Sequence, residues 1–546
     1  MPQKKSAKTL FELCVDNVIK EMDCMWRRKP IEDLDVVDPE ISFTPLDKLP
    51  TAILEELVGG LQKKKLLDNN LRWIITPKLN TLDLTIKCWE RSKEEKMLQH
   101  FKHASITCPM LKVLILHGSS VPDEETIGFL NILPTFTNLQ VLDISNTSAV
   151  DNCFWILGTH CKHLRCLNAN NCYEVTDFGI QGLCLDYVER EKDEDEQQDS
   201  KTRKTDDPEM RERCTPPRLS NSMETLRLDE TEVTKKGIAE ALTKLRSLRV
   251  LEHQSTVKVL AEMHKADFES EEDVISKYEL SEIIFTVKDF QISRNRLWRA
   301  VSLCESISVL NISKIGVSDG YMEGIFVDTE GYQRFDLEII PILKMIGNSL
   351  RELSLYLCSV NTFRVSDCCP NLRKLKLDYG RCSDFLTVDE QSERSNYKEK
   401  KTFPKLEKLE LSCVDISSES LLSLISSSSL KSIVIWDCNT LTDDMLQEAS
   451  NLNFFPNLEY FELYECDFVT EIGINVLLEE SNPLKKIKIS TERSLTREKE
   501  DWNDKIALNN WQLEIEVDKL MTSEEIYAKF SLEGVDFAQI RRNLFG

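Results

Sequence analysis

The sequence predicts an α/β solenoid in which short parallel strands alternate with helices. Two observations predict it. The apolar pattern Leu-x-x-Leu-x-Leu, with Ile, Val or Phe as replacements, recurs along most of the chain. Its clearest copies begin 24 to 28 residues apart, at Leu406, Leu430, Leu458 and Leu484. A period of this length belongs to leucine-rich repeats, whose units must stack because none can bury its apolar face alone. We therefore expect a horseshoe whose strands line the concave wall.

The ends of several repeats carry a further signature. They read Cys172-x-x-Val175-Thr176-Asp177, Cys438-x-x-Leu441-Thr442-Asp443 and Cys466-x-x-Val469-Thr470. These tails resemble the cysteine-containing subclass of leucine-rich repeats, which is common in ubiquitin-ligase substrate receptors. We expect most of the 18 cysteines to be small buried residues of the repeats.

Charge and hydropathy argue against several classes of protein. The sequence has 69 Lys and Arg residues against 93 Asp and Glu residues, and its net charge of -24 argues against a nucleic-acid partner. No apolar run approaches the roughly 18 residues of a membrane span, and residues 1–9 are not followed by the apolar segment of a signal peptide. We expect a soluble intracellular protein, in the cytoplasm or nucleus, without structural disulfides.

Enzyme signatures are absent from the sequence, which has no Gly-rich phosphate loop, no His-Glu-x-x-His and no Gly-x-Ser-x-Gly. One cluster has the residue types of a zinc site: His160, Cys161, His163 and Cys166. Both cysteines fall at apolar repeat positions around Leu164, so we interpret them as core residues. We expect a non-catalytic protein with no metal and no cofactor.

Residues 1–70 are predicted to be helical and to precede the repeats. Thr9 and Glu12 have the spacing of a capping box, and apolar stripes predict a helix over residues 9–22. Residues 27–47 contain three prolines and predict a linker. Pro50 suits the first turn of a second helix, whose apolar residues are Ile53, Leu54, Leu57 and Leu61.

The repeats are expected in two parts, at residues 71–188 and 219–490. Within them, copies of the pattern begin at Leu79, Leu111, Leu139, Leu164, Met223, Leu248, Ile307, Leu350 and Leu372, before the four clear copies. Between residues 255 and 303 the pattern cannot be assigned a repeat phase.

Polar inserts interrupt the array. Residues 189–218 are almost wholly charged or polar, so we expect a disordered acidic loop there, and residues 389–401 are similar but shorter. Residues 491–546 carry several Trp and Phe residues and are expected to form a C-terminal cap, because a solenoid must cover its last core.

The first predicted helix also carries a binding motif. Leu10, Cys14 and Val18 lie one helical turn apart, with the i, i+4, i+8 spacing that a helix needs to enter a groove. Together with Thr9 they resemble the elongin-binding BC-box, in which a leucine, a cysteine and an aliphatic residue enter a groove on elongin C. The resemblance implies elongin B/C as a partner.

A second motif follows at a suitable distance. Leu49, Pro50, Ile53 and Leu57 resemble the cullin-two box that follows a BC-box in VHL-box proteins, which implies a cullin as a partner. With the repeats after it, the layout resembles the Zyg-eleven/Zer-one family of substrate receptors. Members of that family continue into an armadillo-like domain, whereas this sequence ends at Gly546, so their substrate pocket is not carried over.

Two other interpretations of the N-terminal region stay open. A helical pair before a solenoid can be a plain cap, with Leu10, Cys14, Ile53 and Leu57 covering the first repeat. Leu49-Pro50-x-x-Ile53-Leu54 also resembles the start of an F-box. Against the F-box, only about 28 residues separate Leu49 from Leu79, too few for its usual three helices.

Strand alternation places a candidate binding face. The leucines of each pattern point into the core, so the residues between them face the concave wall. Equivalent positions on neighbouring strands hold Tyr356, Asp378, Ser412, Trp436 and Tyr464. Exposed Trp and Tyr are typical interface anchors, and we expect Tyr356, Asp378, Trp436 and Tyr464 to bind a substrate protein.

The sequence therefore predicts a substrate-recognition subunit of an elongin B/C-cullin ubiquitin ligase. It would hold the adapter by its N-terminal boxes and an unknown substrate protein by the concave face. The alternative is a leucine-rich-repeat interaction scaffold, or an F-box-type receptor, without elongin partners.

Overall fold

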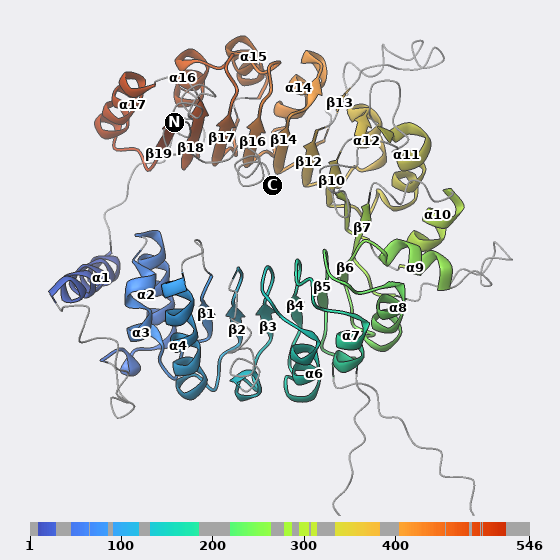
Figure 1. Cartoon of the computed structure of the whole chain (residues 1–546). Helices are drawn as coiled ribbons and strands as arrows, with labels where there is room; N and C mark the ends of the chain where they lie inside the picture. The colour runs from blue at the N-terminus through green and yellow to red at the C-terminus, as the bar shows by residue number, and fades with distance from the viewer. Residues whose placement is uncertain are drawn as a thin grey trace, which may run out of the picture. The chain divides into compact units, whose positions relative to one another are not determined.

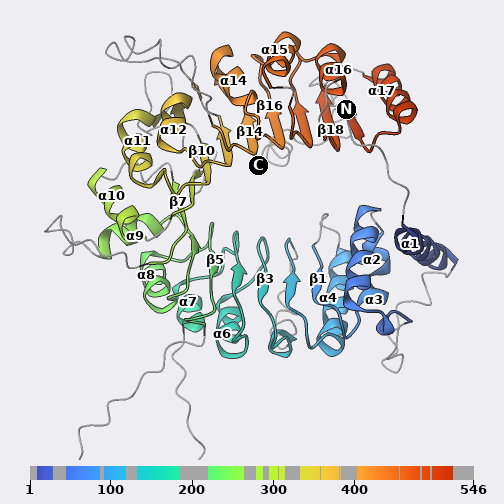
Figure 2. The ribbon, with the colours of Figure 1, turned by 180° about the vertical axis from the view of Figure 1, so that it is seen from behind.

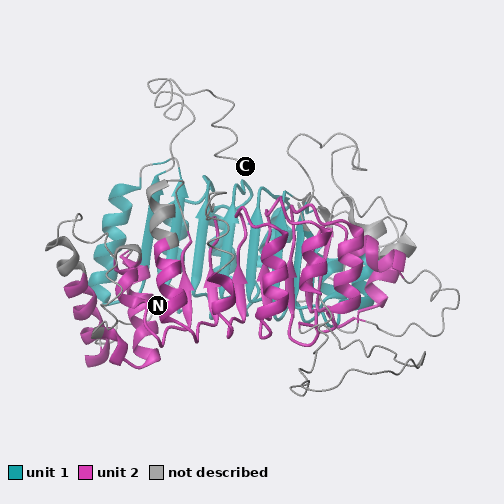
Figure 3. Ribbon diagram, turned by 60° about the horizontal axis from the view of Figure 1, so that its bottom comes forward, with its two compact units in different colours: residues 1–7, 308–314, 320–546 teal, residues 8–307, 315–319 magenta. Residues whose placement is uncertain are grey.

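The structure is a computed structural model. It describes residues 9–28, 45–85, 91–118, 132–184, 219–263, 278–286, 294–313, 333–382 and 403–519, except positions 65, 305, 306, 357, 380, 454, 480–482, 492 and 494. The chain divides into two compact units, which are coloured separately in Figure 3. We call residues 8–307 with 315–319 the N-terminal unit, and residues 1–7, 308–314 and 320–546 the C-terminal unit.

The N-terminal unit begins with helices. They are α1 (Leu10–Arg28), the 3-10 helix η2 (Pro45–Lys48), α2 (Thr51–Lys63) and α3 (Leu67–Ile74). Pro50 precedes α2 in an extended conformation, which suits the residue before a helix start. The predicted helical region is thus present, and it holds α3 as an additional helix between α2 and the first strand.

A parallel sheet follows, with six strands in chain order: β1 (Thr81–Asp83), β2 (Val113–Ile115), β3 (Val141–Asp143), β4 (Cys166–Asn168), β5 (Thr225–Arg227) and β6 (Val250–Glu252). The helices between and after them are α4 (Arg91–Thr107), η3 (Leu133–Thr135), α6 (Asp151–His160), α7 (Asp177–Leu183), α8 (Lys235–Lys244) and α9 (Thr256–Met263). Each strand places its central leucine beside the next, as Leu82, Leu114 and Leu142 do, and these leucines are buried.

The C-terminal unit repeats this plan with longer strands. Its main parallel sheet holds β8 (Val309–Ser313), β10 (Glu352–Tyr356), β12 (Lys374–Asp378), β14 (Lys408–Ser412), β16 (Ser432–Trp436), β17 (Tyr460–Tyr464), β18 (Lys486–Thr491) and β19 (Glu514–Lys519), in that order. A second sheet joins the short strands β9 (Gln333–Arg334), β11 (Cys358–Val360), β13 (Arg381–Cys382) and β15 (Asp415–Ile416). The helices are α11 (Phe335–Ile346), α12 (Thr362–Cys368), α14 (Ser418–Ile425), α15 (Asp443–Asn453), α16 (Glu471–Glu479) and α17 (Thr496–Asn509).

In each unit the helices cover one face of the main sheet, and the two opposite views in Figures 1 and 2 agree on this arrangement. Along β12, β14 and β16, buried Leu or Ile residues alternate with more exposed residues, because successive side chains point to opposite faces. We call the face away from the helices the strand face. The fold is thus a leucine-rich-repeat solenoid, as the sequence predicts.

Several parts of the sequence prediction can be compared with the elements. Residues 255–303, which the pattern could not phase, hold α9, β7 (Glu282–Thr286) and α10 (Arg294–Ser302). One strand more than predicted, β19, follows the last clear copy, and Trp511 and Ile515 beside and within it are buried. The expected insert at 189–218, the shorter one at 389–401 and the tail after residue 519 lie outside the described residues.

Candidate protein-binding surfaces

Helix α1 starts with the capping box that its sequence predicts. The backbone amide of Glu12 donates to Oγ1 of Thr9 at 3.2 Å, and the backbone amide of Thr9 donates to the Glu12 carboxylate at 2.7 Å. These reciprocal bonds satisfy two amides that the helix itself leaves without partners. They also fix where the helix begins, and hence which residues fall on each of its faces.

One face of α1 packs on α2. Ile19 is buried, and a Cβ added at Gly60 would collide with its side chain, so the missing side chain of Gly60 lets the two helices approach closely. At the edge of this contact, Nζ of Lys64 lies 3.0 Å from Oδ1 of Asp16. The contact leaves the opposite face of α1 turned away from α2.

The opposite face of α1 carries the three residues of the predicted BC-box. Leu10 is 79% exposed, Val18 is 37% exposed, and Cys14 between them is exposed. Two further apolar residues beside this stripe are exposed as well, Phe11 and Leu13. A contiguous exposed apolar stripe of this kind on a helix is unfavourable in water and is typical of a surface that a partner covers. We call Leu10, Cys14 and Val18 the α1 stripe.

The predicted cullin-binding residues at the start of α2 have different environments. Leu49 and Ile53 are half-buried and Pro50 is exposed, so all three can be reached from solvent. Leu57 cannot be reached, because it is only 1% exposed and lies in the core with Leu54 and Leu61. The structure therefore assigns Leu57 to packing rather than to a contact surface.

The two alternative interpretations fit these environments unequally. In the plain-cap interpretation Leu10 and Cys14 would cover the first repeat, but both are exposed. Apart from Ile19 of α1, the buried apolar residues before β1 come from α2, α3 and the segment after α3, for example Leu61, Leu71 and Ile75. In the F-box interpretation three helices follow the Leu-Pro pair. Only α2 and α3 are described between Leu49 and β1.

The strand face of the C-terminal unit brings the predicted substrate-binding residues into one row. Tyr356 pairs with Asp378, Asp378 with Ser412, Ser412 with Trp436 and Trp436 with Tyr464, each on the next strand of the sheet. This register is the one that the spacing of the leucine patterns predicts. The row places polar and aromatic side chains side by side at the carboxyl ends of five parallel strands.

Within this row, Trp436 and Tyr464 stack. Their ring centroids lie 3.9 Å apart with an interplanar angle of 12°, and Nζ of Lys488 lies 5.2 Å from the centroid of the Tyr464 ring. The Tyr464 hydroxyl donates to Oε2 of Glu462 at 2.7 Å. Burial and this carboxylate raise the pKa of Tyr464 to about 12, so the phenol is neutral and keeps its proton in the bond. Sequence reasoning found the aromatic residues but not this stack or the cation over it.

At the other end of the row, Asp378 and Tyr356 each contact a neighbouring side chain. Asp378 forms an ion pair with Lys376 on the same strand at 2.7 Å, and the rings of Tyr356 and Tyr379 meet edge to face at 5.9 Å between centroids. Tyr379 has a left-handed backbone, as do Cys413, Asp437 and Glu465 at the same position of later repeats. The amide of each of these four residues donates across to the next strand, which explains how the conformation recurs without glycine.

One polar cluster in the N-terminal unit has the residue types of a catalytic triad. Nδ1 of His117 lies 2.8 Å from Oγ of Ser145, but that hydroxyl donates to Oδ1 of Asp143 at 2.5 Å. In a triad the carboxylate orients the histidine, whereas here it holds the serine, which is buried. Asn168 also donates to Asp143, at 3.0 Å. We interpret the cluster as a polar network that joins neighbouring repeats.

The cysteines near His160 lie in the repeat core or at its edge. Cys161 is buried, and burial raises the pKa of its thiol to about 11, whereas His160 and His163 are exposed on either side of it. Among the described residues, no group of three or more His, Cys, Asp or Glu side chains is placed to hold a metal ion. No helix of the described chain is both long and apolar enough to cross a membrane.

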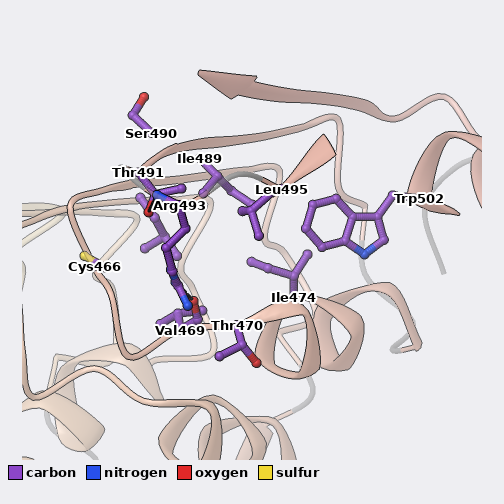
Figure 4. Close-up of a pocket in the computed structure, with 11 residues that line it drawn as sticks. Cys466, Val469, Thr470, Ile474, Ile489, Ser490, Thr491, Arg493, Leu495 and Trp502 are labelled. Atoms are coloured by element: carbon purple, nitrogen blue, oxygen red, sulfur yellow. Dashed lines mark hydrogen bonds between the residues drawn. The ribbon is translucent and has the colours of Figure 1, made fainter. Parts of the chain in front are cut away.

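Figure 4 shows a pocket near the end of the C-terminal unit. It is lined mainly by apolar residues, including Ile474, Ile489 and Trp502, and Arg493 reaches into it to donate to the carbonyl oxygen of Val469 at 2.6 Å. Its free volume is about 10 Å³, enough for one water molecule at most. The pocket is therefore a packing defect rather than a ligand site.

Comparison with known proteins gives structural neighbours only. No family model and no curated protein matches the chain. Rad7, in the crystal structure of its complex with Elc1 in yeast, is 17% identical with a TM-score of 0.43, and the match covers 89% of this chain and 94% of that one. A leucine-rich-repeat protein of Leptospira interrogans is 16% identical with a TM-score of 0.31, covering 94% of this chain and 100% of that one. At these values neither match indicates a partner or a function.

Proposed function

We propose that the chain is a substrate-recognition subunit that binds elongin B/C through the α1 stripe. The proposal rests on one observation: Leu10, Cys14 and Val18 are exposed at BC-box spacing, while the opposite face of the same helix is buried on α2. A helix that is held by one face and apolar on the other is ready to enter a groove. Because α1 is already docked and capped, little ordering entropy remains to be lost on binding.

The contact with a cullin is proposed for a smaller set than the sequence pattern suggests. Leu49, Pro50 and Ile53 are accessible at the start of α2 and form the proposed contact. Leu57 holds the helix in the unit instead. A cullin would then contact the first turn of α2, and the adapter would contact α1 in the same N-terminal unit.

The protein itself would carry out no chemistry. Its role is to hold a substrate protein on the strand face, where Trp436 and Tyr464 are the anchors, while a ubiquitin carrier bound elsewhere in the ligase performs the transfer. The alternative is an interaction scaffold that uses the same strand face without elongin. The two functions differ only in whether the α1 stripe has a partner, so a binding experiment separates them.

The test is co-elution of the full chain with purified elongin B/C in size-exclusion chromatography. We expect wild type to co-elute and Leu10→Asp to elute alone, because a carboxylate in an apolar groove costs several kcal/mol. Ile106→Asp is the matched control, since Ile106 is an exposed apolar residue on α4 of the same unit, 84% exposed. Thermal melting of both variants should match wild type. Co-elution of Leu10→Asp, or failure of wild type to bind, would favour the scaffold.

A further inference from the structure

The stack on the strand face continues on one side of Trp436 and stops on the other. On one side Tyr464 stacks on Trp436, and Nζ of Lys488, which pairs with Glu462 in the strand register, lies 5.2 Å from the centroid of the Tyr464 ring. On the other side the neighbouring strand offers Ser412, whose side chain is too short to cover an indole. Trp436 is 44% exposed, consistent with a ring that is covered on one face only.

The short side chain of Ser412 lies between two larger ones. Trp436 stands on the strand to one side of it, and Asp378 stands at the equivalent position on the strand to the other side. Strands in a sheet lie about 4.8 Å apart, so roughly 10 Å separate the backbones that carry the indole and the carboxylate. A planar group stacked on the indole needs about 3.5 Å, and the remaining roughly 6 Å is enough for that group also to donate to Asp378. We call this space the Ser412 slot.

Two carboxylates and one ammonium group border the Ser412 slot, which leaves it a net negative charge. Asp378 forms one wall, and Asp437 follows Trp436 directly and is exposed. Burial, with Asp437 as the next contributor, raises the pKa of Cys413, which follows Ser412. Lys376 pairs with one oxygen of Asp378 and leaves room for a second donor. The slot therefore favours a cation over an anion.

We propose that the Ser412 slot binds the guanidinium group of an arginine in an extended segment of a partner protein. The guanidinium would stack on the free face of Trp436 and donate to Asp378, which repeats on this side the cation that Lys488 supplies at Tyr464. Arginine fits better than lysine because its group is planar and can stack and donate at the same time. As the substrate class of a ligase subunit this inference rests on the proposed function, but the binding itself can be measured without elongin.

The test is an NMR titration of the full chain labelled on its tryptophan indole nitrogens. The probe is the tripeptide acetyl-Leu-Arg-Leu-amide, and the matched control is the same tripeptide with citrulline, which keeps the shape of arginine and lacks its charge. Trp436→Phe assigns the indole signal. We expect this signal to shift in a saturable way with the arginine peptide, and the citrulline peptide to bind about tenfold more weakly, the usual gain from a charge-assisted contact.

Two variants test the walls of the slot. Ser412→Trp should abolish the shift by filling the space, and Asp378→Asn should weaken binding about tenfold by removing the charge. No saturable shift up to 20 mM peptide would overturn the proposal, as would equal binding of the citrulline peptide or of Ser412→Trp. The same two variants are also tested for co-elution with elongin B/C, which they should retain because both substitutions lie outside α1. This second measurement distinguishes failure of the slot from failure of the proposed function. If the peptide does not bind but elongin B/C still co-elutes, the slot proposal is overturned and the proposed ligase function stands. If the peptide binds but elongin B/C does not co-elute, the protein is a peptide-binding scaffold.

Discussion

The carboxylate of Asp177 accepts hydrogen bonds from both the backbone amide and the side-chain hydroxyl of Thr234 in the following repeat. Oδ1 accepts from the Thr234 amide at 2.8 Å, Oδ2 accepts from its hydroxyl at 2.6 Å, and Oδ1 also accepts from the amide of Gly237 at 3.1 Å. A carboxylate in the first turn of one helix thus accepts the hydrogen bonds that the start of the next helix would otherwise leave without an acceptor. We call this aspartate–threonine contact between neighbouring repeats the joint. The same joint links Asp151 to Thr176 and, in the C-terminal unit, Asp443 to Thr470.

The joint at Asp443 gives a stability prediction. Asp443→Ala leaves three donors of Thr470 and Gly473 without their acceptor, so we expect the free energy of unfolding to fall by about 1 to 3 kcal/mol. Asp444→Ala is the control, because both carboxylates lie in the first turn of α15 and interact alike with the helix dipole. Urea denaturation measures the difference. Equal destabilisation by the two variants would assign the effect to the helix dipole instead.

The residue three positions after the joint threonine, Gly237 or Gly473, has to be glycine. A Cβ added at Gly473 would collide with the Asp443 carboxylate, and one added at Gly237 would lie 2.5 Å from Oδ1 of Asp177. We expect Gly473→Ala to destabilise the protein, although alanine favours helices over glycine by about 1 kcal/mol. Gly59→Ala is the control, since its added Cβ would meet no atom within 4 Å, and it should be neutral or stabilising. Thermal melts compare the two, and a stabilised Gly473→Ala would contradict the steric argument.

The joint between Asp177 and Thr234 also bears on the expected insert. β4 and β5 pair directly, so the repeats on either side of residues 189–218 stack as neighbours. Deleting these 30 residues leaves 29 residues between Leu164 and Met223, close to the 28 between Leu111 and Leu139. We therefore predict that the deletion variant keeps the melting temperature and the elongin binding of wild type. A drop of more than about 5 °C, which corresponds to roughly 6 kcal/mol for a chain of this size, would show that the segment packs on the repeats.

His253 predicts a pH dependence of stability. The side chain is buried after β6, where Nδ1 accepts from the amide of Ser255 at 3.0 Å, and burial lowers its pKa to about 4. An unfolded chain binds the proton near pH 6.5, whereas the folded chain does not until about pH 4. The free energy of unfolding therefore falls as pH falls across this window, by about 3 kcal/mol in total, and levels off below it.

The variant His253→Asn isolates this effect, because the amide oxygen can accept from Ser255 and does not titrate. We expect the stability of wild type relative to this variant to decrease between pH 6.5 and 4, measured by denaturant titration at several pH values. The comparison with a variant is needed because Asp229 acts in the opposite direction. Burial, with Glu230 and Glu252 nearby, raises its pKa to about 6, so its contribution to stability falls as pH rises from about 4 to 6. A constant difference between wild type and variant would exclude His253 as the source.

The register of the repeats could be predicted because each core position is fixed by a leucine or its replacement. Ser412, Trp436 and Tyr464 fall in one row for that reason alone. Strand β7 could not be phased because Ile283, Ile284 and Phe285 are consecutive apolar residues. Strand β19 was not predicted because the region that begins at Trp511 lacks the leading leucine. There the neighbouring repeats, rather than the local pattern, decide the fold.

For the candidate sites too, the sequence pattern predicts some features, and tertiary packing decides the others. The spacing of Leu10, Cys14 and Val18 places them on one helix face, but only packing against Gly60 decides that this face is the exposed one. Leu57 has a suitable spacing for a cullin contact, yet the same apolar character that suggests a contact also places it in the core. The Trp436 and Tyr464 stack depends on side-chain conformations that no sequence pattern specifies.

The aromatic stack gives the last prediction, which concerns capture of an intact substrate. Trp436→Ala should weaken capture by about 2 kcal/mol, as expected for an interface hot spot, and should leave elongin binding unchanged. Charge reversal at Asp378 or Glu462 should chiefly slow association and reduce its dependence on salt. Phe468→Ala is the control, since Phe468 is an aromatic residue of the same unit, 56% exposed but outside the strands. The measurement compares the proteins captured from cell extract by wild type and each variant. If Trp436→Ala and wild type capture identical sets, substrate binding does not depend on the strand face around Trp436.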